Sequence, residues 1–223
     1  MANMAANAVA KGANEAALPA SGRFSFVRGL HVSDYLTLAN GMGGAGAVLA
    51  VLAYMSDGRF PWLALALALH PISLAMDFLD GRVARARGKS SALGADLDSL
   101  ADVVSFGVAP AAIGFAVGLR GGWDVLALLF LVACAIGRLA RYNVTSAALS
   151  DESGKVRYFE GIPVTGSLLV VAALAAAALT GHLGAALPLG AHRLGPFVLH
   201  PLALAYVIVG CGMVSKQLHV PKP

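Results

Sequence analysis

The chain has 223 residues, of which 58% are hydrophobic and only 13% are charged. Soluble domains carry about 25% charged residues, so this composition excludes an ordinary soluble enzyme and indicates a protein embedded among membrane lipids. The net charge of +4 does not indicate a nucleic-acid partner, because the basic residues form no stripe interleaved with aromatic residues. The length suits one domain of several membrane helices, so we expect any chemistry to take place within that domain.

The N-terminal region differs in composition from the rest of the chain. Residues 1–21 are rich in alanine and asparagine and lack the apolar core of a signal peptide, which predicts a disordered tail. Residues 22–33 mix apolar and basic side chains, which is typical of a short interfacial helix leading into a first span. Residues 22–219 are predicted to form a single membrane domain.

Six apolar stretches approach the roughly 20 residues that a helix needs to cross a bilayer. They cover residues 35–56, 60–80, 95–119, 123–143, 163–183 and 196–215. The predicted fold class is therefore all-α, a polytopic membrane protein of six transmembrane helices. Four glycines in the first stretch predict close helix packing, because small side chains let backbones approach. Both cysteines lie inside apolar stretches, which predicts buried free thiols.

The distribution of basic residues predicts the orientation of the spans. The two terminal regions and the links 81–94 and 138–162 together hold 13 of the 16 Lys and Arg residues. The connections on the other side hold only Arg59, Arg120 and Arg193. Because cytoplasmic loops are enriched in Lys and Arg, both termini and the 81–94 link are predicted to lie on the cytoplasmic side of the cell membrane.

Four aspartates lie in or beside the second and third predicted spans: Asp77, Asp80, Asp98 and Asp102. An ionisable side chain at this depth is costly unless it is paired or faces a polar cavity, so these residues are candidates for a functional site. Spacings of three and four residues place each pair on one face of its helix. Two such faces that meet would gather four carboxylates, which repel one another unless a cation neutralises them.

The chemistry of these ligands favours a particular class of cation. A site built only from oxygen ligands selects hard ions such as Mg²⁺, Mn²⁺ or Ca²⁺ over zinc, and two ions fit four carboxylates. Salt bridges to the basic residues of the 81–94 link could absorb one or two of the aspartates, but not all four. Arg85 follows Asp80 by five residues, close enough to hold a phosphate oxygen. Metal, arginine and backbone amides together are typical of phosphoryl transfer.

The same segment carries a recognisable pattern of eight fixed positions: Asp77, Asp80, Gly81, Ala84, Arg85, Gly94, Asp98 and Asp102. This pattern resembles that of the CDP-alcohol phosphatidyltransferase family. Its members have six transmembrane helices, usually form homodimers, and use Mg²⁺ or Mn²⁺ to displace CMP from a CDP-linked lipid with an alcohol. By that resemblance all four aspartates would ligate metal, and Asp102 would also be the catalytic general base.

The resemblance also implies a nucleotide site and an acceptor. Gly81, Ala84, Arg85 and Gly94 would line the CDP site, and Thr37 and Asn40 of the segment 34–41 would approach the nucleotide. The segments 103–111, 138–144 and 158–166 resemble those of the membrane-spanning phosphatidylserine synthases and their archaeal relatives. The implied substrates are therefore CDP-diacylglycerol and L-serine, and the implied products are phosphatidylserine and CMP.

Serine presents a carboxylate that needs a cationic partner. Arg138 or Arg141 could bind it through a bidentate pair, with Arg141 favoured, and Asn143 could add a polar contact. The alternative is that these arginines only anchor the cytoplasmic end of the fourth span.

Two other functions stay open at this point. A sister enzyme would use glycerol phosphate, inositol phosphate or choline as acceptor, or an archaeal-type lipid as donor. A cation transporter or channel is disfavoured, because its path needs polar residues at mid-membrane depth in several helices.

Overall fold

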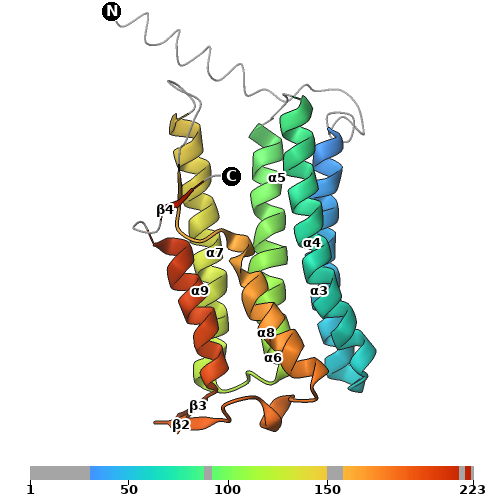
Figure 1. The fold of residues 1–223 in the computed structure, drawn as a ribbon, viewed down its shortest axis with the longest axis vertical. Helices are drawn as coiled ribbons and strands as arrows, with labels where there is room; N and C mark the ends of the chain where they lie inside the picture. The colour runs from blue at the N-terminus through green and yellow to red at the C-terminus, as the bar shows by residue number, and fades with distance from the viewer. Residues whose placement is uncertain (1–30, 88–91, 150–157, 216–218, 222–223) are drawn as a thin grey trace, which may run out of the picture. The chain divides into compact units, whose positions relative to one another are not determined.

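The computed structural model describes residues 31–87, 92–149, 158–215 and 219–221. The predicted tail at 1–21 and most of the predicted interfacial helix at 22–33 lie outside these residues, so neither prediction is tested. The described residues are predominantly helical, with only short strands (Figure 1). The predicted all-α membrane class is therefore confirmed.

Four helical segments are long and apolar enough to cross a membrane. They are α3 (Val32–Asp57), α4 (Phe60–Arg87), a continuous run of three elements, and α7 (Gly122–Leu149). The continuous run consists of α5 (Ala92–Asp102), the π-helical turn η1 (Val103–Val108) and α6 (Ala109–Val117). These segments correspond to the first four predicted spans.

The last two predicted spans are shorter in the structure than in the sequence prediction. The first comprises the 3₁₀ turn η2 (Val164–Gly166) and α8 (Ser167–Leu179), and the second η4 (Pro201–Ala203) and α9 (Leu204–Val214). Helix α8 ends before Gly181, whose φ of 77° is incompatible with a right-handed helix. Both segments fall below about 20 residues, so six spans remain a prediction.

The remaining described elements are short. Strands β2 (His192–Leu194) and β3 (Phe197–Leu199) form an antiparallel hairpin that turns at Gly195, where φ is 62°. The predicted span 196–215 is therefore wrong at its start, because its first residues pair as a strand. Strand β1 (Tyr158–Glu160) pairs with β4 (His219–Pro221), and η3 (Gly184–Ala186) follows α8.

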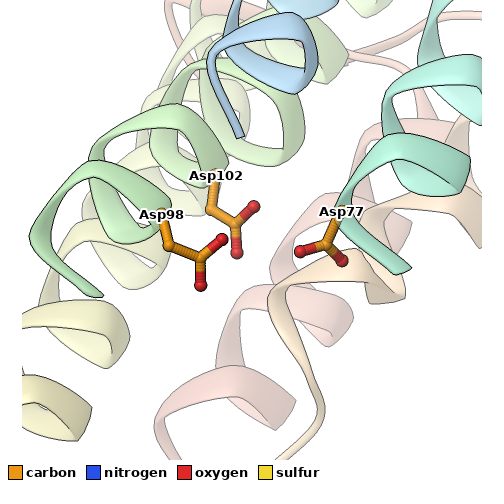
Figure 2. A group of neighbouring side chains, drawn as sticks. All are labelled: Asp77, Asp98 and Asp102. Atoms are coloured by element: carbon orange, nitrogen blue, oxygen red, sulfur yellow. The ribbon is translucent and has the colours of Figure 1, made fainter. Parts of the chain in front are cut away.

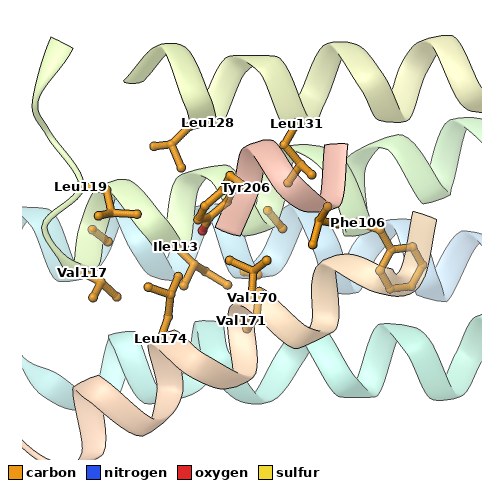
Figure 3. Packing of buried hydrophobic residues seen from close by; sticks show 14 of the residues in the cluster. Phe106, Ile113, Val117, Leu119, Leu128, Leu131, Val170, Val171, Leu174 and Tyr206 are labelled. Carbon is orange, nitrogen blue, oxygen red and sulfur yellow. The ribbon is translucent and has the colours of Figure 1, made fainter. Parts of the chain in front are cut away.

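A core of buried apolar side chains lies between these helices. Figure 3 shows Phe106, Ile113, Leu131, Leu174 and Tyr206, which come from η1, α6, α7, α8 and α9 and are all fully buried. Helix α3 packs along α4 and also against α5, η1 and α6, while α7 packs against α9. This packing brings α4 and α5, the two helices that carry the aspartates, both into contact with α3.

The cysteines follow the prediction only in part. Both thiols are free, as expected. Cys134 is buried, but Cys211 is exposed, so its predicted burial is wrong. Cys211 lies on a face of α9 that no described helix covers, and an apolar sequence does not distinguish that face from the packed one.

Gly44 lets α3 lie directly against η1, as the glycine-rich sequence predicts. A Cβ at this position would lie 2.6 Å from Ser105 Cα and 2.8 Å from Ser105 N. Because the backbone of a packed helix cannot yield locally, we expect Gly44→Ala to destabilise the protein by about 1–3 kcal/mol. The measurement is the thermal unfolding midpoint of the purified protein in detergent.

Gly137 supplies the matched control for this prediction. It lies within α7, and a Cβ there would meet no heavy atom within 4 Å. Gly137→Ala should leave the midpoint unchanged or raise it, since alanine favours a helix over glycine by about 1 kcal/mol. Equal midpoints for the two variants would contradict the close packing of Gly44.

Candidate active site

Three of the four predicted aspartates converge between α4 and α5. One carboxylate oxygen from each of Asp77, Asp98 and Asp102 lies within 4.8 Å of the others. Figure 2 shows Asp98 and Asp102 extending from one helix towards Asp77 on the other. Asp102 is buried, and Asp77 and Asp98 are partly buried. The four-residue spacing thus places Asp98 and Asp102 together, whereas the three-residue spacing brings only Asp77 of its pair into the group.

Asp80 lies outside this group of three. Its Oδ2 accepts a hydrogen bond of 2.7 Å from Thr37 Oγ1 of α3, and the side chain is only 5% exposed. Thr37, for which family resemblance predicts a place near the nucleotide, contacts a carboxylate in the structure.

Asn40 makes the equivalent contact with Asp102. Its Nδ2 donates a hydrogen bond of 3.0 Å to Asp102 Oδ1. The backbone oxygen of Asn40 accepts two further hydrogen bonds, from Ser73 Oγ of α4 at 3.2 Å and from Ser105 Oγ of η1 at 2.8 Å. Sequence reasoning missed both serines, because a serine within an apolar stretch carries no signal of its own.

The π-helical turn η1 explains how Ser105 reaches α3. It begins at Val103, immediately after Asp102, and Ser105, Phe106 and Gly107 within it are buried. A π turn inserts an additional residue into the helical repeat and so rotates the side chains that follow it; such turns are frequent at functional sites.

A cavity of about 410 Å³ opens beside the three aspartates. Its walls come from α4, α5, α7 and η2, so four separated parts of the sequence form it. Several predicted site residues line it: Asp77, Gly81, Arg85, Asp98, Asp102, Arg138 and Asn143. The other predicted site residues are not among its lining: Thr37, Asn40, Asp80, Ala84, Gly94 and Arg141.

Two arginines of α7 lie in different surroundings. Arg138 lines the cavity and is only 8% exposed, and its Nε is buried without a hydrogen-bond partner among the described residues. Arg141 instead donates a hydrogen bond of 3.3 Å from Nη1 to the backbone oxygen of Val214. Of the two arginines, Arg138 is therefore the one that combines a place in the cavity wall with a buried nitrogen lacking a partner among the described residues.

Asn143 connects α7 to α5 at the edge of the cavity. Its Oδ1 accepts a hydrogen bond of 2.9 Å from Ser99 Oγ, and its Nδ2 lies 3.5 Å from Asp96 Oδ1. Ser99 also lines the cavity. The side-chain amide of Asn143 is therefore already engaged in hydrogen bonds within the protein.

The acidic group fits a divalent cation. Asp98 Oδ1 is buried and has no hydrogen-bond donor among the described residues. Burying a carboxylate oxygen without a hydrogen-bond donor costs free energy. A cation bound jointly by Asp77, Asp98 and Asp102 would give this oxygen a partner. The donor set contains only carboxylate oxygens, which suits a hard cation.

Fold and site together define an integral membrane enzyme, with carboxylates and arginines gathered around one cavity. The sequence profile of the CDP-alcohol phosphatidyltransferase family matches residues 30–211. The chain belongs to this family, which confirms the family predicted from the aspartate pattern.

Individual relatives are consistent with that membership. The chain is 44% identical to CDP-diacylglycerol–serine O-phosphatidyltransferase of Saccharomyces cerevisiae over 203 residues, covering 90% of this chain and 74% of that protein. It is 34% identical to the protein of the same name from Methanocaldococcus jannaschii over 149 residues, covering 66% and 62%. The Mycobacterium leprae protein of that name is 42% identical over 118 residues, covering 49% and 37%.

A solved structure shares the fold. It is the Mycobacterium tuberculosis phosphatidylinositol phosphate synthase with CDP-DAG bound, with a TM-score of 0.50 and 21% sequence identity. The match covers 85% of this chain and 83% of that one. At this identity the likeness concerns the fold alone.

Proposed function

We propose that this enzyme transfers the phosphatidyl group of CDP-diacylglycerol to the hydroxyl of L-serine, giving phosphatidylserine and CMP. The observation that carries the proposal is the cavity, which joins the acidic group to the buried Arg138. The names of its relatives, serine O-phosphatidyltransferases from yeast, archaeal and bacterial sources, support the choice of acceptor.

Asp77, Asp98 and Asp102 would hold Mg²⁺ or Mn²⁺, and family resemblance adds Asp80 as a further ligand. Bound there, the metal would activate the phosphorus and neutralise the departing phosphate. Arg85 lines the same cavity and would hold the diphosphate through charge-assisted hydrogen bonds. Gly81 would admit the nucleotide close to the backbone of α4.

Asp102 would take the proton from the serine hydroxyl. The hydroxyl oxygen then forms a bond to the lipid-side phosphorus, and the bond from that phosphorus to the oxygen of CMP breaks, with its electron pair leaving on CMP. The position of Asp102 in the cavity wall and its hydrogen bond from Asn40 support this role.

Arg138 would bind the carboxylate of serine. A guanidinium matches a carboxylate through two parallel hydrogen bonds, and burial of Arg138 strengthens them. Arg141 is used instead in a contact with α9, through the backbone of Val214.

We also propose six spans, a homodimer, and a cell membrane location with both termini and the cavity on the cytoplasmic side. The orientation follows from the excess of Lys and Arg on that side of the predicted spans. The dimer rests on family resemblance.

One assay tests the proposed reaction. Purified protein is incubated with CDP-diacylglycerol, Mn²⁺ and one alcohol at a time, and the released CMP is measured. We expect release with serine only, its loss on chelation with EDTA, and its return with added Mn²⁺. Release only with glycerol phosphate, inositol phosphate or choline would reject serine as acceptor, and metal-dependent ion flux without CMP release would favour transport.

A further inference from the structure

Helix α3 presents two polar side chains to the acidic helices. Thr37 and Asn40 are one turn apart, are 4% and 0% exposed, and each donates a hydrogen bond to one aspartate. Thr37 contacts Asp80 of α4, and Asn40 contacts Asp102 of α5. We propose that Asn40 is a positioning residue, which orients Asp102 for metal binding and does not itself contact the nucleotide. This inference rests on the proposed metal site.

The location of Asn40 favours this role over a nucleotide contact. The side chain is fully buried and does not line the cavity, whereas Asp102 does. A nucleotide in the cavity therefore reaches Asp102, while Asn40 lies behind it. The amide of Asn40 engages one oxygen of Asp102, Oδ1, and leaves the other for a cation.

The backbone of Asn40 is held by two hydrogen bonds of its own. Its carbonyl oxygen accepts the hydroxyls of Ser73 and Ser105. Ser73 lies one helical turn before Asp77, and Ser105 lies three residues after Asp102. A single carbonyl thus connects α3 to α4 and to η1, which follows α5 directly, and this connection fixes the position from which the amide reaches Asp102.

An amide suits this position for an electrostatic reason. It donates a hydrogen bond to Asp102 without neutralising the negative charge that attracts a cation, whereas lysine or arginine would compete with the metal. Hydrogen bonds of this kind orient metal-ligating carboxylates, and their loss typically costs about 10–100-fold in metal affinity or activity.

The first test replaces Asn40 by leucine, which has the same branching at Cγ and no hydrogen-bond donor. Mn²⁺ binding is measured by electron paramagnetic resonance on the full-length purified protein, without substrate. We expect the dissociation constant to rise about tenfold or more and kcat to fall. The KM for CDP-diacylglycerol should stay within about threefold of its original value. An unchanged Mn²⁺ affinity with a raised KM for CDP-diacylglycerol would overturn the proposal and make Asn40 a nucleotide contact.

A double-mutant cycle then asks whether Asn40 acts through Asp102. If it does, Asn40→Leu should weaken Mn²⁺ binding no further in a protein that already carries Asp102→Asn. Fully additive losses would show that Asn40 acts independently and would overturn the proposal. Should the leucine variant not fold, Asn40→Ala removes the same donor and takes its place in the cycle.

Tyr206→Phe is the control for a general loss of stability. The hydroxyl of Tyr206 donates a hydrogen bond of 2.7 Å to the backbone oxygen of Pro110 in the core. This variant should unfold at a lower temperature yet bind Mn²⁺ normally. If it lost as much Mn²⁺ affinity as Asn40→Leu, the effect of Asn40→Leu would be due to reduced stability, and the specific role of Asn40 would be rejected. Because Mn²⁺ binding needs no serine, the outcome is separate from that of the CMP-release assay.

Discussion

Replacing Asp98 by asparagine is expected to abolish CMP release, lowering kcat by about a thousandfold or more, since a metal ion contributes several kcal/mol to such a reaction. Asp98 carries the buried oxygen that has no donor among the described residues, so it depends most directly on a cation. An amide there removes one negative charge and one ligand oxygen. Asp77→Asn should have a similar effect, because Asp77 completes the same group.

The measurement is CMP release by the purified variants at saturating CDP-diacylglycerol and serine, with Mn²⁺ binding followed separately. Asp57→Asn is the control. Asp57 is exposed and lies at the end of α3. Its carboxylate accepts hydrogen bonds from the backbone N–H of Arg59 and from the indole N–H of Trp62. It should retain full activity. Normal turnover by Asp98→Asn or Asp77→Asn would contradict the metal site.

Replacing Arg138 by alanine is expected to raise the KM for serine by about a hundredfold, because losing one partner of a buried charged pair typically costs 2–5 kcal/mol. The KM for CDP-diacylglycerol should change little, since in the proposed mechanism Arg85 and the metal site hold the nucleotide. Arg138→Lys should recover only part of the loss, because an ammonium group cannot form two parallel hydrogen bonds with a carboxylate. Initial rates of CMP release at varied serine concentration measure both effects.

Arg141→Ala distinguishes the two arginines. If Arg138 binds serine, the Arg141 variant should lose mainly its contact with Val214 and keep a nearly normal KM for serine. The sequence-based preference for Arg141 predicts the reverse, and that result would move the carboxylate site to Arg141. Arg193→Ala, in the exposed strand β2, controls for a general effect of removing positive charge.

Some features follow from local rules and were therefore predictable from the sequence. The positions of the first four long helices follow from apolar length, because a bilayer demands about 20 apolar residues in a row. Helical spacing and the cost of burying charges predicted that the aspartates converge, which Asp77, Asp98 and Asp102 do and Asp80 does not. The family followed from the eight-residue pattern in that segment.

Other features depend on how elements rotate and pack against each other. Arg138 and Arg141 are three residues apart and lie on neighbouring sides of α7, so the sequence does not show which of them faces the cavity. The packing of α7 against α5, η2 and α9 decides this, because it directs Arg138 to the cavity and Arg141 to Val214. The early end of α8 and the β2–β3 hairpin depend on glycines with positive φ, which an apolar window overlooks.

The aspartate-rich segment also combines features that its sequence predicts with features that depend on tertiary packing. The sequence by itself identified the family, because the segment carries all eight fixed positions of that family's pattern, and the family match over residues 30–211 confirms it. Metal binding by the segment stays a prediction. Only the tertiary structure decided that Asn40 holds Asp102 and that Thr37 holds Asp80, since those hydrogen bonds join residues 62 and 43 positions apart. Gly44 lets η1 pack closely against α3, and the glycines of that stretch predict such packing, but which side chains then meet depends on the tertiary arrangement.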